Sequence, residues 1–121
     1  MYSTRYFTHN VSVMIGEFEY LVLAACQRLG DKAYGVSIAE DIQAASARHC
    51  SSGALHLTLD RLEAKGFVTT RMGEATQQRG GRAKRLVRIT GLGHQAAAEF
   101  HTTVTRATRG IRWQGAKQCV T

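Results

Sequence analysis

The stretch that most constrains the fold of this 121-residue chain runs from Ser51 to Ile89. It opens with an amphipathic segment that ends at Lys65-Gly66, where a glycine is typical of the residue just after a helix. Two β-favouring segments follow, Phe67–Arg71 and Leu86–Ile89, separated by a loop rich in glycine and arginine. A helix followed by a basic β-hairpin is the layout of a winged helix, so we expect an α+β, mainly α domain.

Two further amphipathic helices are expected before this stretch. Residues 15–29 carry apolar side chains at three- and four-residue steps, and Gly30-Asp31 ends that helix. The next helix is expected to begin at Ser37, which has capping-box spacing to Glu40, and to bury Ile38, Ala39, Ile42 and Ala45. We expect a short extended piece within residues 47–50. The whole pattern predicts a winged helix-turn-helix, with three helices and a β-hairpin wing.

The third helix has an inward and an outward arc. Leu55, Leu59 and Leu62 fall together at 100° per residue and are expected to face the core. The outward arc offers hydroxyls, backbone N–H groups, an imidazole and leucine methyls, which suit phosphates and base edges in a DNA major groove. The alternative for the outward leucine is packing on the wing, and Asp60 is expected to pair with a neighbouring arginine. The candidate DNA-reading residues are Ser51, Ser52, Gly53, His56, Leu57 and Arg61.

The net charge of +7 is concentrated in the second half of the chain. Residues 1–70 carry six Lys or Arg against seven Asp or Glu, whereas residues 71–121 carry ten against two. Such an uneven distribution is typical of a surface that meets a polyanion, and the alternative is a solvated basic face. The candidate DNA-binding residues of the wing are Arg79, Arg82, Lys84 and Arg85.

Strand geometry limits how many of these cations can face DNA. Alternate residues of a strand point to opposite faces, so only one of Lys84 and Arg85 is expected to contact DNA if the strand has begun at these residues. Glycines flank the loop tip and would allow Arg79 and Arg82 to approach a phosphate or enter a minor groove.

The last predicted helix spans residues 91–112 and has a heptad pattern of apolar side chains. Its threonines and Gly110 make it marginal alone, so we expect it to pair with a second copy of the chain. Packing back on its own domain is the alternative. The expected dimer interface consists of Ala97, Phe100, Val104, Ala107 and Ile111. Residues 113–121 are expected to form a tail.

The ends of the chain and its cysteines indicate a cytoplasmic protein. The sequence contains neither an apolar run of ~20 residues, which a membrane span needs, nor a secretory signal. Residues 1–13 are expected to form a disordered arm, with Met14 as a candidate natural start. Cys26, Cys50 and Cys119 are odd in number and widely separated, which fits a reducing compartment.

The motifs of common enzymes are missing from this sequence. It has no Walker loop, no HExxH and no GxSxG, so we expect no enzymatic activity. His49, Cys50 and His56 are too few and too irregularly spaced to predict a metal site. No cofactor or metal is expected.

Three segments resemble the PadR-like family of bacterial winged-helix transcriptional regulators. They read AYGVSIAEDI at 33–42, SSGALHLTLDRLEAKGFV at 51–68 and RGGRAKRLVRIT at 79–90, and the resemblance covers roughly residues 14–95. It implies a winged-helix DNA-binding domain at 14–90 with the third helix as the reading helix. It also implies a C-terminal dimerisation helix. His56 stands where the family usually has tyrosine.

The resemblance also implies a function. Members bind pseudo-palindromic operators as homodimers, usually as repressors, and some bind aromatic effectors between their C-terminal helices. Phe100 and Trp113 are candidate residues for such an effector pocket, with simple interface or surface packing as the alternative. We therefore expect a homodimeric regulator that binds double-stranded DNA sequence-specifically. The alternatives are a winged-helix module that binds an acidic protein and a small-molecule sensor.

Overall fold

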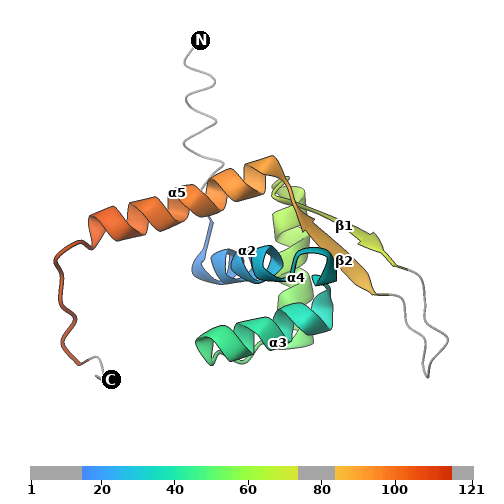
Figure 1. The fold of residues 1–121 in the computed structure, drawn as a ribbon, viewed down its shortest axis with the longest axis horizontal. Helices are drawn as coiled ribbons and strands as arrows, with labels where there is room; N and C mark the ends of the chain where they lie inside the picture. The colour runs from blue at the N-terminus through green and yellow to red at the C-terminus, as the bar shows by residue number, and fades with distance from the viewer. Residues whose placement is uncertain (1–14, 74–83, 116–121) are drawn as a thin grey trace, which may run out of the picture.

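The computed structural model describes residues 15–73 and 84–115. Within these ranges three packed helices form a centre from which a β-hairpin and a long helix extend in opposite directions (Figure 1). This mainly helical arrangement confirms the predicted winged-helix fold class. The elements in chain order are α2 (Glu17–Leu29), the 3-10 turn η1 (Gly30–Lys32), α3 (Gly35–Ser46), α4 (Ser52–Ala64), β1 (Val68–Met72), β2 (Arg85–Ile89) and α5 (Gly91–Ala107).

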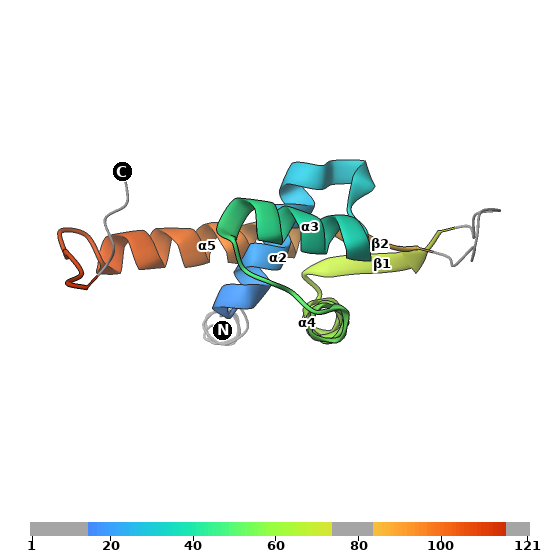
Figure 2. The ribbon, with the colours of Figure 1, turned by 90° about the horizontal axis from the view of Figure 1, so that it is seen from below.

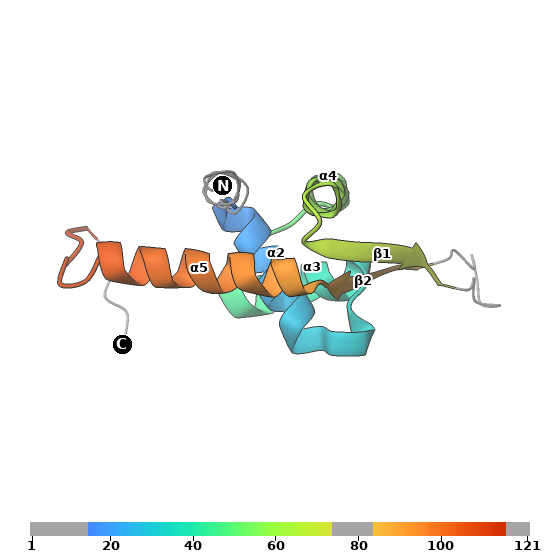
Figure 3. The same cartoon turned by 90° about the horizontal axis from the view of Figure 1, so that it is seen from above.

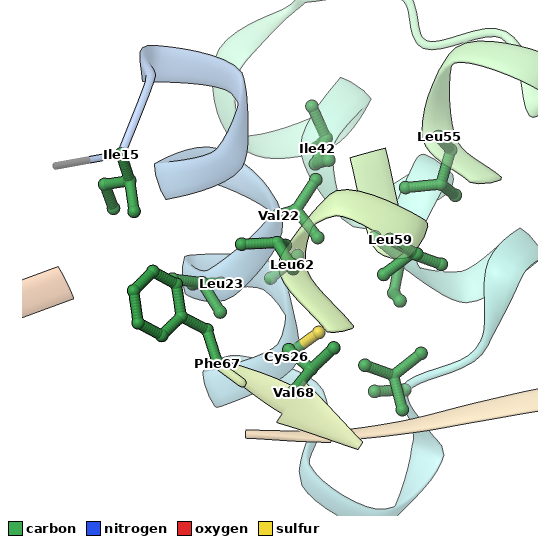
Figure 4. Packing of buried hydrophobic residues seen from close by; sticks show 14 of the residues in the cluster. Ile15, Val22, Leu23, Cys26, Ile42, Leu55, Leu59, Leu62, Phe67 and Val68 are labelled. Carbon is green, nitrogen blue, oxygen red and sulfur yellow. The ribbon is translucent and has the colours of Figure 1, made fainter. Parts of the chain in front are cut away.

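The hydrophobic core lies where α2, α3 and α4 meet the base of the hairpin (Figure 4). The predicted inward arc of α4 is confirmed, because Leu55, Leu59 and Leu62 are each no more than 1% exposed. Phe67 and Val68 continue the core from α4 into β1. The side chains of α4 that face away from this core are therefore the ones left for a partner.

Helix α4 begins and ends as its sequence predicts. The Oγ of Ser51 accepts a hydrogen bond from the Ala54 N–H at 3.1 Å, which satisfies one of the free N–H groups at a helix start. Gly66 has a φ of +83°, a conformation that costs glycine little. These two ends fix where α4 stands relative to the strand that follows it.

The hairpin pairs β1 with β2 in antiparallel register, from Val68 opposite Ile89 to Met72 opposite Arg85. A short extended piece joins β2 on its other side, at Ala33 and Tyr34. The Val87 N–H donates to the Ala33 carbonyl at 3.0 Å, and Tyr34 forms a bridge with Leu86.

Residues 47–50, where a short extended piece was expected, form neither a strand nor a bridge. Ala47 instead ends α3 in a left-handed conformation with φ of 61°. The extended piece that exists lies before α3, where β2 supplies a neighbouring strand to pair with.

The predicted start of α3 was also wrong. The helix begins at Gly35, and Ser37 is its third residue, whose Oγ accepts a hydrogen bond from the Tyr34 N–H at 3.0 Å. Pairing with β2 holds Tyr34 extended, so the helix begins directly after it. Ala45, expected to be buried, is exposed, whereas Ile38 and Ile42 are buried as predicted.

Helix α5 is shorter than predicted and ends at Ala107 rather than at residue 112. Thr90 fixes its start, since the Thr90 Oγ1 accepts from the Gly93 N–H at 3.0 Å and donates to the Gly66 carbonyl at 2.7 Å. Beyond its end, Gly110 has a φ of +83°, which is unsuitable for a continuing helix.

The two halves of α5 have different surroundings. Ala96 is fully buried, and the Phe100 ring packs on that of Tyr20 with centroids 4.7 Å apart. Further along, Val104 is 43% exposed, and the helix runs on past the helical centre (Figures 2 and 3). The predicted heptad face is thus covered by the chain's own domain over the first half of the helix only.

None of the helices in the described parts of the chain is both long enough and apolar enough to span a bilayer. The expected arm at 1–13 and most of the expected tail lie outside the described residues. Of the tail, Trp113, Gln114 and Gly115 are described and are exposed.

Candidate nucleic-acid interface

The first turn of α4 presents its backbone to solvent. Ser51, Ser52 and Gly53 are all exposed, as the proposed contact with DNA requires. The N–H groups at the start of a helix have no acceptor within it, and the helix dipole favours an anion at this end. This turn therefore has the chemistry to bind a phosphate.

The outward face of α4 continues the same surface. Leu57 and Arg61 follow Gly53 at four-residue intervals, which places the three on one side of the helix. Leu57 is 53% exposed, and Arg61 is exposed. A leucine methyl surface and a guanidinium next to the helix start suit the floor and edge of a DNA groove.

His56 lies apart from this outward face, at a hollow between the helices and the wing. The hollow has a volume of about 780 Å³ and is bounded by the start of α3, the first half of α4 and the start of β2. His56 is half-buried there. We call this feature the wing-side hollow. Its lining includes Tyr34, Gly35, Val36, His56, Lys84 and Arg85.

The guanidinium of Arg85 contacts side chains of α4 rather than pointing into solvent. Its Nη2 lies 2.9 Å from the Asp60 Oδ1 and 3.3 Å from the Glu63 Oε1, and its Nη1 lies 3.2 Å from the His56 Nδ1. The Arg85 side chain is only 17% exposed. The expectation that Asp60 pairs with an arginine is confirmed, whereas Arg85 has the environment of a structural cation.

Lys84, the residue before Arg85, is exposed on the wing side of the hollow. Its Nζ lies 4.2 Å from the centroid of the Tyr34 ring, a cation–π contact that holds the ammonium near the start of α3. Lys84 precedes β2, and both cations line the same hollow, so strand alternation does not separate them. They differ in their contacts, because Arg85 is paired with carboxylates whereas Lys84 is exposed. Arg79 and Arg82 lie outside the described residues, and their contact with DNA stays a prediction.

Sequence reasoning missed the start of α3 as part of this surface. Tyr34 and Gly35 line the wing-side hollow, and Val36 is 63% exposed beside them. Periodicity alone did not mark these residues, because α3 was expected to begin later. The one available signal was the extended Tyr-Gly pair before a helical pattern.

The two described cysteines are thiols of low reactivity. Burial, together with a smaller effect of the nearby carboxylate of Asp41, raises the pKa of Cys26 to about 12. Partial burial also raises the pKa of Cys50, against the opposing effect of Arg48. Asp41 itself forms a hydrogen-bonded ion pair with Arg28, which raises the pKa of that guanidinium. In the described residues no three His, Cys, Asp or Glu side chains gather as a possible metal site.

Phe100 and Trp113, the candidate effector residues, lie in different environments. The Phe100 ring packs on Tyr20, whereas Trp113 lies beyond the end of α5 and is 69% exposed. A groove of about 480 Å³ runs between α2 and α5, and neither Phe100 nor Trp113 is among its lining residues. The single chain thus does not build the expected pocket from these two side chains.

Comparison with known proteins places this geometry in a family. The model of the transcriptional regulator PadR-like family matches residues 22–99. No curated protein matches the chain. Among solved structures, the chain is similar to a PadR-like transcription factor from Bacteroides fragilis, with a TM-score of 0.62 and 22% identity over 75% of this chain and 82% of that one.

Two further solved structures have the same fold. A PadR family transcription regulator from Clostridium difficile has a TM-score of 0.56 and 20% identity, over 78% of this chain and 100% of that one. Bacillus subtilis PadR in complex with operator DNA has a TM-score of 0.56 and 21% identity, over 86% of this chain and 53% of that one. This chain therefore matches about half the length of the Bacillus subtilis protein.

Proposed function

Since the chain belongs to the PadR-like family of transcriptional regulators, we propose that it is a homodimeric repressor that binds a pseudo-palindromic operator sequence-specifically. The observation that carries this proposal is the exposed outer surface of α4 together with exposed Lys84, which lies just before β2 and lines the same hollow as α4. Bacillus subtilis PadR, which has the same fold, binds operator DNA.

Helix α4 is proposed as the reading helix. Its first turn, Ser51, Ser52 and Gly53, would meet a phosphate or base edge, and Leu57 would contact a thymine methyl. Arg61, further along the same face, would reach the DNA backbone. These roles are supported by the exposure of all five residues and by the buried leucines on the opposite side of the helix.

The wing would grip the flanking backbone. Lys84 supplies an exposed ammonium at the hairpin, and the sequence adds Arg79 and Arg82 in the connecting loop. We give Arg85 no phosphate contact, because Asp60 and Glu63 already neutralise it.

The second half of α5 is proposed as the dimer interface. Val104 is 43% exposed, although it continues the heptad face on which Ala97 and Phe100 are half-buried. Ile111, the last residue of the expected interface, lies beyond the end of α5 and is 49% exposed. A second copy would cover these side chains and remove the apolar surface from water. Two reading helices would then meet half-sites about one DNA turn, ~34 Å, apart.

Binding measured by fluorescence anisotropy tests this function. The probe is the intergenic DNA upstream of the gene at ~150 mM salt, and the control is a shuffled duplex of equal length. We expect binding to the probe to be tighter by at least ~10³-fold. If each protomer neutralises three or four phosphates, log K should fall with log salt at a slope of about −5 to −7.

Two variants distinguish contacts with base edges from contacts with the DNA backbone. His56→Ala should change the preference among operator variants, whereas Lys84→Ala should weaken binding to all sequences alike. Equal, weak binding of the wild-type protein to the probe and the shuffled duplex would contradict an operator upstream of the gene. Salt-sensitive binding to an acidic protein, without preference among DNA sequences, would replace the proposal by a protein-interaction module.

A further inference from the structure

The guanidinium of Arg85 contacts three side chains on one side of α4. His56, Asp60 and Glu63 are spaced at i, i+4 and i+7, so their side chains share one side of α4. All three contact Arg85 of β2, with atoms between 2.9 and 3.3 Å apart. The two carboxylates hold the guanidinium from one direction, which leaves Nη1 directed at the imidazole.

This contact determines which nitrogen of His56 carries the proton. A guanidinium can only donate hydrogen bonds, so the Nδ1 of His56 must be the acceptor in its contact with Arg85. In a neutral imidazole one nitrogen accepts and the other donates, and the proton therefore resides on Nε2. Arg85 thus fixes His56 as a hydrogen-bond donor.

The His56 Nε2 lies beside the backbone of Gly35, and both residues line the wing-side hollow. A Cβ on Gly35 would lie 3.4 Å from this nitrogen, so any side chain at that position would lie against it. His56 is the fifth residue of α4, within the part of a recognition helix that meets base edges.

We propose that Arg85 is a positioning residue for DNA reading: it presents His56 as an Nε2–H donor to a hydrogen-bond acceptor on a base edge in the major groove. The DNA contact in this inference rests on the proposed function. The protonation state of the imidazole is independent of that function. Acceptors of this kind are the N7 and O6 atoms of guanine, N7 of adenine and O4 of thymine.

The state of the imidazole is measured first, on the free wild-type protein. ¹⁵N spectra of histidine-labelled protein at pH 8, where imidazoles are mostly neutral, distinguish protonated from unprotonated ring nitrogens. The His56 signals are identified by their loss in His56→Gln. We expect a proton on Nε2 and an unprotonated, hydrogen-bonded Nδ1; a proton on Nδ1 would overturn the inference while leaving the proposed function intact.

Arg85→Lys then tests positioning without a change of charge. If Arg85 acted only as a charge near phosphates, lysine would largely replace it. The lysine ammonium cannot contact His56 and both carboxylates at once, as the planar guanidinium of Arg85 does. We expect the preference for the operator over single-base variants to fall about 10-fold at one base pair, with an unchanged salt slope. Arg88→Lys, at an exposed site on the same strand, is the matched control and should have no effect.

Amide substitutions identify the reading atom. The terminal amide of glutamine reaches the position of Nε2, whereas that of asparagine reaches only the position of Nδ1. We expect His56→Gln to retain most of the preference at that base pair and His56→Asn to lose it. Wild-type preference in Arg85→Lys, or a uniform loss over all sequences in His56→Asn, would overturn the inference. If the wild-type protein prefers no DNA sequence, the proposed function fails, and the ¹⁵N spectra alone decide the state of His56.

Discussion

Both carboxylate oxygens of Glu19 lie 3.0 Å from the Nζ of Lys65, which joins the first turn of α2 to the end of α4. The two partners differ in exposure, since the side chain of Glu19 is 9% exposed and that of Lys65 is 37% exposed. The Glu19 Oε1 also accepts a hydrogen bond from the Gly16 N–H at 2.9 Å. This ion pair helps to set the position of α4 against α2.

The difference in exposure predicts unequal effects of removing either partner. Lys65→Met leaves a buried carboxylate without its cation and should lower the free energy of unfolding by about 2 kcal/mol. Glu19→Gln leaves an ammonium that water still reaches, and its amide oxygen can still accept from Gly16, so it should cost less than about 1 kcal/mol. Urea unfolding of both variants measures the two values. A larger cost for Glu19→Gln than for Lys65→Met would contradict this account of the pair.

Gly93 allows the start of α5 to approach the chain that follows α4. A Cβ on Gly93 would lie 2.1 Å from the Phe67 carbonyl oxygen and 2.8 Å from the Ile89 Cγ2. Gly93→Ala should therefore destabilise the protein by about 3 kcal/mol, because backbone atoms must move. Gly91→Ala is the matched control on the same helix turn, since its Cβ would meet nothing within 4 Å. Thermal unfolding should show a large decrease in Tm for the first variant and at most a small change for the second.

The two described cysteines should differ in alkylation. Burial raises the pKa of Cys26 to about 12, so at pH 8 its thiolate fraction is roughly a thousandfold below that of an ordinary thiol. Its 3% exposure restricts the reagent further. Iodoacetamide labelling followed by peptide mass spectrometry should find half-buried Cys50 modified well before Cys26 in the native protein. In urea the two rates should converge; native rates within tenfold of each other would argue against the buried thiol.

The projecting half of α5 provides a test of self-association. Val104→Asp should convert a dimer into a monomer in light scattering, because a charge would enter the proposed apolar interface. Thr105→Asp adds the same charge to an exposed residue about 100° further around the helix and should leave the dimer intact. The helical content of both variants should remain that of the wild-type protein. A monomeric wild-type protein, or equal behaviour of the two variants, would contradict the interface.

The elements that sequence predicted well are those whose signals are local. The inward leucines of α4, its serine cap and Gly66 at its end all follow from residues within one or two turns of each other. The hairpin strands were recognised for the same reason. The start of α3 was misplaced because its cause is distant in sequence: Tyr34 is extended through its bridge with Leu86.

The candidate site shows the same division. The pairing of Asp60 with an arginine was expected from the sequence, whereas the alternation argument for Lys84 and Arg85 does not apply, because β2 begins only at Arg85. The tertiary contact with α4 then selected Arg85 as the paired cation and brought His56 to it. The start of α3 entered the site only through the way it packs beside the wing-side hollow.

By itself, the sequence determined the winged-helix pattern, the buried and outward arcs of α4 and the basic character of the wing, because periodicity, caps and charge are properties of neighbouring residues. Only the tertiary structure decided how much of the heptad face of α5 is covered within the chain, because this depends on which part of α5 packs on α2. The Phe100 ring packs on Tyr20 of α2, whereas Val104 is 43% exposed. The tertiary structure also decided which nitrogen of His56 contacts Arg85, because that depends on a guanidinium 29 residues away in the chain.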